Sequence, residues 1–114
     1  MIEETVFNYL NYHLSAPVYI SKPKNTGTVK EYFLLEKTGT GLNNKISQAT
    51  FALQSYASSK YRAAALMEEA KAAMLDGLIT LDVISNVELN GGGDFTDTTK
   101  KEPRYQSVFV VTHY

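Results

Sequence analysis

The chain contains no cysteine, and that absence excludes several kinds of site at once. There is no disulfide framework, no thiolate nucleophile and no zinc site built on cysteine ligands. An excess of charge of either sign is also missing, because 11 basic residues stand against 12 acidic ones and the net charge is −1. We therefore expect no overall basic field that recruits nucleic acid.

Long apolar runs are absent as well. No segment approaches the length that spans a membrane, so we expect no membrane partner. The first ten residues, MIEETVFNYL, are acidic and lack both a basic start and an apolar core, which argues against a secretory signal. The remaining composition, 44% hydrophobic and 20% charged, is typical of one globular domain spanning residues 1–114.

The N-terminal segment carries a helical pattern. Ile2, Val6, Leu10 and Leu14 recur every four residues, which places them on one face of a helix. The residue before a proline is pushed away from the helical region, so we expect this helix to end before Pro17.

A second, longer helix is predicted over SSKYRAAALMEEAKAAMLDG, residues 58–77. Ser58 or Ser59 caps its start, and Gly77 ends it. We expect a face of mostly small residues to lie flat on a sheet, and the opposite face to be open to a second partner. The first face comprises Tyr61, Ala64, Ala65, Met67 or Glu68, Ala72 and Leu75, and the second comprises Leu66, Ala70, Ala73 and Met74.

Strands are predicted where apolar residues alternate or β-forming residues dominate. The segments are PVYIS, EYFLLEK, residues 48–57, DVISNVELN and RYQSVFVVTHY. We expect TGTGLNN to be a turn, so that the first three strands form a meander. In DVISNVELN the alternation places Val83, Ser85, Val87 and Leu89 on one face.

These elements predict an α+β fold. We expect an antiparallel sheet of about four to five strands, typical of a domain of this size, with the N-terminal helix and the long central helix packed on one face. The residues expected to be buried under the central helix are Phe51, Leu53, Val87, Phe109 and Val111.

The segment from Asn90 to Pro103 reads as a long polar loop, and loops of this length are often functional. Its three glycines do not predict a phosphate site, because phosphate-binding glycine loops lead into a helix and here a strand follows. We expect them to allow positive φ in a wide turn or bulge. Asp94 and Asp97 lack the further oxygen ligands that a calcium loop supplies, so we expect no metal site.

No catalytic constellation is evident. The histidines, His13 and His113, stand alone in the sequence, and the GxSxG pattern of a serine nucleophile does not occur. We therefore expect no enzyme activity and no cofactor.

The order of elements, closing with DFTDTTKKEPRYQSVFVVTHY, resembles the tail terminator proteins of long-tailed bacteriophages, also described as tail completion or head–tail joining proteins. The matching residues are 94–97 (DFTD) and 104–106 (RYQ), which lead into the last strand. The N-terminal helix and the helix before the last hairpin match as well, so the resemblance covers essentially the whole chain.

The resemblance implies a structural protein of the virion, assembled in the host cytoplasm, that forms a ring, usually a hexamer, on the finished tail tube. Such a ring stops tube polymerisation and offers a surface to neck or head-completion proteins, and DNA only passes through its lumen. The loop is then a contact device that a neighbouring subunit or the tube orders. Phe95 is its expected apolar anchor, and Lys100, Lys101 and Arg104 are expected to pair with acidic groups of the neighbour. The predicted interaction residues are Gly91, Gly92, Gly93, Asp94, Phe95, Asp97, Lys100, Lys101 and Arg104.

Two other functions remain open from the sequence. The chain could be another neck or head-completion protein of the virion, which would differ in the surface that it caps. It could also be a small α+β domain that binds a ligand or acts as an enzyme.

Overall fold

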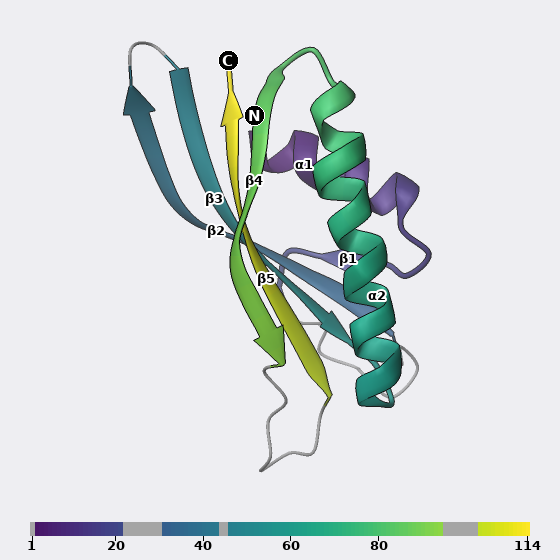
Figure 1. The fold of residues 1–114 in the computed structure, drawn as a ribbon. Helices are drawn as coiled ribbons and strands as arrows, with labels where there is room; N and C mark the ends of the chain where they lie inside the picture. The colour runs from purple at the N-terminus through teal and green to yellow at the C-terminus, as the bar shows by residue number, and fades with distance from the viewer. Residues whose placement is uncertain (1, 22–30, 44–45, 95–102) are drawn as a thin grey trace.

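One layer of helices covers one face of a β-sheet (Figure 1). The structure is a computed structural model, and it describes residues 2–21, 31–43, 46–94 and 103–114. In chain order the elements are α1 (Ile2–His13), β1 (Val18–Tyr19), β2 (Tyr32–Asn43), β3 (Ile46–Tyr56), α2 (Lys60–Ala72), the π turn η1 (Ala73–Gly77), the 3₁₀ turn η2 (Leu78–Thr80), β4 (Ile84–Asp94) and β5 (Arg104–His113). The α+β class predicted from the sequence is confirmed.

The strand order in the described sheet is β1-β2-β3-β5-β4. The prediction of a purely antiparallel sheet was wrong, because β1 pairs with β2 in parallel, Val18 against Phe33 and Tyr19 against Leu34. A short turn can join only antiparallel neighbours, so this pair also excludes the expected three-stranded meander. The pairs β2–β3, β3–β5 and β5–β4 are antiparallel, as expected.

The segment TGTGLNN, predicted as a turn, mostly continues β2 as far as Asn43. Thr38 falls in a register shift, after which Gly39 and Thr40 pair with Thr50 and Ala49 of β3. Glycine is a turn signal only when the chain needs its conformational freedom, and Gly39 adopts no positive φ here. The long cross-strand partner therefore overrides the local turn composition.

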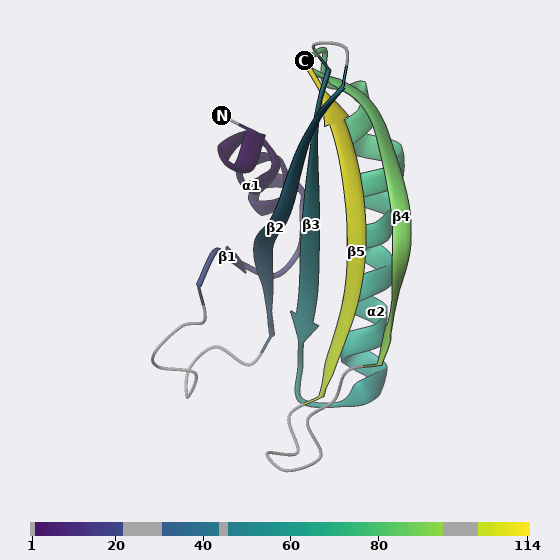
Figure 2. The ribbon, with the colours of Figure 1, turned by 90° about the vertical axis from the view of Figure 1, so that its left-hand side faces the viewer.

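The core lies between the helices and one face of the sheet. All five residues predicted to be buried are buried, and Phe51, Leu53, Phe109 and Val111 are fully enclosed. Val6 and Leu10 of α1 join the same apolar cluster, so both helices cover the same face as predicted. Figure 2 shows how they divide that face, with α1 at the β1–β2 end and α2 at the β5–β4 end.

The second helix turns toward the sheet mainly the face that we expected to be open to a second partner, and of the face predicted to pack inward only Met67 is buried. Leu66 and Met74 are buried, whereas Tyr61 is 81% exposed. Burial of apolar surface contributes about 25 cal/mol per Å², so the face with the larger apolar side chains packs inward in preference to the alanine-rich one. The prediction that Ser59 caps the helix is confirmed, since its hydroxyl accepts a hydrogen bond from the amide of Arg62.

Gly77 does not end the helix as predicted. The chain passes through the π turn η1 into η2 and leaves the helical region only at Leu81. The glycine matters for a different reason, because a Cβ at this position would take the space of the Tyr9 hydroxyl on α1, so that ring would have to move. Gly77 therefore lets α1 approach the end of α2.

The alternation predicted for β4 was also wrong. Ile84 and Val87 are buried, whereas Val83 and Leu89 are 47% and 42% exposed. A register shift between Ile84 and Asn86 places Ser85 in a bulge, so the two buried residues are three apart and not two. The bulge leaves apolar side chains exposed along this edge of the sheet.

The face of the sheet away from the helices is closed at one end by an aromatic cluster. The rings of Tyr32 and Tyr56 stack with centroids 4.6 Å apart, and Tyr19 meets Tyr32 edge-on. The Tyr56 hydroxyl donates to Gln54, whose amide donates to Gln106, both at 2.8 Å. The rest of this face is more open to water, as the sequence predicted for β3.

Replacing Phe51 with alanine should lower the free energy of unfolding by about 3–5 kcal/mol, because it deletes a fully enclosed ring at the centre of the core. Asp94→Ala is the control. It removes an ion pair between two partly exposed groups, Asp94 and Lys60, and such a pair contributes at most about 1 kcal/mol. Chemical denaturation of both variants measures the difference. Equal losses would contradict this description of the core.

Stability should also depend on pH through Glu31, which accepts two hydrogen bonds from the Arg62 guanidinium at 2.7 and 2.9 Å. These hydrogen bonds hold the pKa of the Glu31 carboxyl below its usual value of 4.5. The lowered pKa means that the pair stabilises the fold at neutral pH, and that this stabilisation disappears as the pH falls through the folded-state pKa.

Glu31→Gln should therefore lower the melting temperature at neutral pH, with the difference from the unsubstituted chain vanishing in acid. Thermal unfolding followed by circular dichroism across this pH range is the measurement. A difference that stays constant with pH would exclude a role for the charge of Glu31.

Candidate protein-interaction surfaces

The glycine-rich segment predicted as a loop begins as a strand. Residues 90–94 belong to β4, and Gly92, Gly93 and Asp94 pair with Ser107, Gln106 and Tyr105 of β5. The predicted loop from Asn90 to Pro103 is therefore shorter than the sequence indicated. Its remainder, residues 95–102, lies outside the described residues.

The glycines allow positive φ beside a bulge, as one of our sequence interpretations proposed. The register shifts between Leu89 and Gly92, and Gly91 has a φ of +108°. Gly92 meets a further constraint, because a Cβ there would collide with the carbonyl oxygen of Gln106 and lie 2.8 Å from the Cα of Ser107. A side chain at Gly92 would push β4 away from β5, so glycine is needed for the pairing itself.

Because the three glycines have no side chains, a groove remains between β4 and α2. This cavity of about 290 Å³ is bounded by Gly91–Gly93 on β4 and by Met67 on α2. Leu89 and Tyr105 add apolar surface, and at its edge Lys71 pairs with Glu68 at 3.3 Å. The groove and the exposed Leu89 form an apolar strip along the β4 edge, which we call the β4 surface.

The structure does not gather the predicted interaction residues on one surface. Asp94 lies on the helix side, where it pairs with Lys60 of α2 at 3.4 Å. Arg104 lies on the opposite face, with its guanidinium 5.9 Å from the centre of the Tyr56 ring and 3.4 Å from the Tyr56 hydroxyl. The other charged and aromatic candidates, Phe95, Asp97, Lys100 and Lys101, lie outside the described residues.

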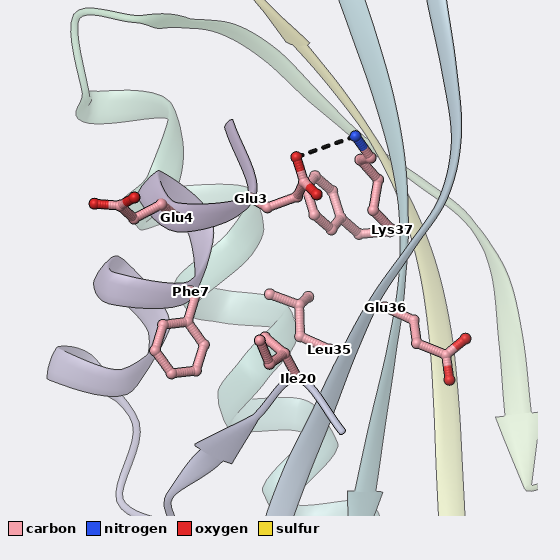
Figure 3. A pocket seen from close by; sticks show the side chains of 8 residues that line it. Glu3, Glu4, Phe7, Ile20, Leu35, Glu36 and Lys37 are labelled. Atoms are coloured by element: carbon pink, nitrogen blue, oxygen red, sulfur yellow. Dashed lines mark hydrogen bonds and ion pairs between the residues drawn. The ribbon is translucent and has the colours of Figure 1, made fainter. Parts of the chain in front are cut away.

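A second surface lies at the opposite end of the sheet, and the sequence analysis missed it. An open cavity of about 530 Å³ separates α1 from β2. Figure 3 shows the side chains of Phe7, Ile20 and Leu35 facing this space. At one end Lys37 pairs with Glu3 at 3.0 Å. We call this the β2 surface.

One signal in the sequence could have pointed to the β2 surface. Ile20 follows a strand of only two residues and is 67% exposed. In the sequence, Ile20 is followed at once by a polar segment rich in lysine. A large apolar residue in that place has few apolar neighbours along the chain to cover its side chain. The segment PVYIS was predicted only as a strand.

Among the described residues no group of three or more histidine, aspartate or glutamate side chains could hold a metal ion. His13 contacts the rings of Tyr9 and Tyr12 on α1, and His113 ends β5. Within the same residues no helix is long and apolar enough to cross a membrane.

In comparisons with known proteins, no family model matches the chain and no curated protein matches it.

Gly92→Ala should destabilise the protein by about 1–3 kcal/mol, the cost of a strained backbone that the surroundings cannot relax. Gly39→Ala is the matched control, since Gly39 also lies in a strand but an added Cβ would make only ordinary contacts at 3.8 Å with Thr50. We expect this control to be neutral or slightly stabilising. Urea denaturation of both variants measures the contrast, and an unchanged stability in Gly92→Ala would show that β4 does not pair with β5 at this point.

Proposed function

We propose that this chain is a structural subunit of a phage tail, one that forms a ring on the end of the tail tube, stops tube polymerisation and offers a surface for head joining. The resemblance of residues 94–97 and 104–106 to tail terminator proteins is the starting point for this proposal. Its partners are then further copies of itself, the tube protein and a neck or head-completion protein. DNA would only pass through the ring.

The observation that best supports an assembly function is the β4 surface. β4 is the last strand of the described sheet, so its outer edge carries no further strand in that part of the chain. Unpaired edges and exposed apolar strips are features that proteins either shield or use for association. Here Val83 and Leu89 are exposed along the edge, and the glycine groove adjoins it.

The chain positions on either side of residues 95–102 support the same proposal. Asp94, at the end of β4, precedes this segment and Pro103 follows it before β5, so the described residue at which the segment begins lies next to the β4 surface. A contact made by Phe95 and a contact made by Leu89 would then belong to one interface. In this proposal the loop and the edge of β4 contact the same partner.

A second candidate function is ligand binding, and one observation favours it. The cavity of about 530 Å³ at the β2 surface has the size of many small-molecule sites, and its lining combines apolar side chains with a few charged ones. A thermal-shift screen with nucleotides, divalent metals and small apolar acids tests this alternative. A large and specific shift would favour ligand binding over the tail function.

Shortening the loop should abolish tube capping without unfolding the domain. A deletion of residues 91–101 would remove the last residues of β4, so the sharper variant replaces only residues 95–102 with Asn-Gly. A second variant, Leu89→Asp, keeps the loop and places a charge on the β4 edge. We expect both variants to yield overlong or headless tails by electron microscopy, with circular dichroism spectra that match the unsubstituted chain.

The matched control is Tyr12→Asp, which places the same charge on an 85% exposed residue of α1, far from β4 in the fold. It should leave tail length unchanged. Tails of normal length assembled with both β4 variants would overturn the proposal.

A further inference from the structure

The outer edge of β2 is only partly covered. β1 pairs with Phe33 and Leu34 and no further, so in the described chain β2 has no strand partner on this side from Leu35 onward. Figure 2 shows the short β1 beside only one end of β2. A row of backbone amides and carbonyls that lacks a partner is a template to which an extended segment can add as a further strand.

An apolar cavity adjoins this free edge on the helix side. Phe7 from α1, Ile20 after β1 and Leu35 from β2 line it, and Ile20 is largely exposed. Successive side chains of a strand point to opposite faces of a sheet. Every second side chain of an added strand would therefore point to the helix side, toward the cavity, where an apolar group fits.

The other side chains of an added strand would meet Glu36. This residue lies between Leu35 and Lys37 on β2, and Figure 3 shows its carboxylate directed away from the cavity, to the other face of the sheet. Lys37 is already paired with Glu3, while Glu4 lies exposed at the cavity's outer side. Among the residues that the structure describes at this edge, the charge offered to a partner is thus acidic on both faces.

We propose that the β2 edge binds an extended segment of a different protein in which apolar and basic residues alternate. The apolar residues enter the cavity beside Ile20 and Leu35, and a lysine or arginine pairs across the strands with Glu36. This inference rests on the proposed assembly function, because it names the chemistry of one partner in that assembly.

Charge decides against a second copy of the chain as the occupant. The other free edge of the sheet is β4, whose direction would suit pairing with β2. β4, however, carries Glu88 on the face opposite the helices, where it pairs with Val110 of β5. A second copy would therefore bring an acidic edge to the face that already carries Glu36, and like charges opposite each other destabilise strand pairing.

The test uses two fluorescein-labelled synthetic peptides, one of alternating valine and lysine and one of alternating valine and glutamate. Fluorescence anisotropy with the full chain should show saturable binding of the lysine peptide, roughly three- to tenfold tighter than that of the glutamate peptide and weakened by salt. Glu36→Lys should reverse this preference. Ile20→Asp should abolish binding of the lysine peptide, since it places a charge in the apolar wall of the cavity.

Glu88→Lys is the matched control, because it makes the same charge change on the same face but at the other edge of the sheet. It should leave the preference for the lysine peptide intact. All three substitutions are at exposed residues, and circular dichroism verifies that each variant is folded.

Equal binding of the two peptides, no saturable binding, or an unchanged preference in Glu36→Lys would overturn the inference. Sedimentation tests the other occupant: self-association of the chain that Ile20→Asp abolishes would assign the edge to a second copy and overturn it as well. Tail capping is measured separately with the β4 variants. Failed peptide binding together with loss of capping in the β4 variants overturns only this inference, whereas the expected peptide binding together with tails of normal length from both β4 variants overturns only the proposed function.

Discussion

The register between β3 and β5 is the constraint on which the rest of the structure depends. It places Phe51 directly opposite Phe109 and Ala49 opposite Val111, all on the face under the helices. Side chains alternate between the faces of a strand, so a slip of one residue would turn this apolar row to water and bring Thr50 and Val110 inward. Both helices dock on the surface that this row creates, and the strands β2 and β4 flank it.

The strength of this central pairing explains which features could be predicted from the sequence. The buried face of β3 and β5 was readable because Phe51, Leu53, Phe109 and Val111 repeat with the period of a strand. The N-terminal helix was readable because Val6 and Leu10 repeat with the period of a helix. In both cases the local pattern and the tertiary contacts favour the same structure.

The remaining features could not be predicted, because a distant partner decided them. Gly39 reads as a turn residue until β3 is known to continue beside it, and Gly92 reads as a loop residue until β5 is known to need the space. The inward face of α2 was ambiguous, since an alanine-rich stripe and a Leu–Met stripe lie on the same helix, and the larger apolar area of the second decided which one packs on the sheet. The β2 surface could not be predicted because Phe7, Ile20 and Leu35, which line its cavity, are far apart in the sequence.

The contact between Tyr9 and Gly77 has a mechanical consequence for the β2 surface. Tyr9 lies on the same helix as Phe7 and Glu3, which form one wall of that cavity. The hydroxyl end of the Tyr9 ring occupies the space in which a side chain at residue 77 would stand. A side chain added at residue 77 would therefore have to displace the Tyr9 ring, and any part of that displacement passed on to α1 would move Phe7 and Glu3 at the edge of β2.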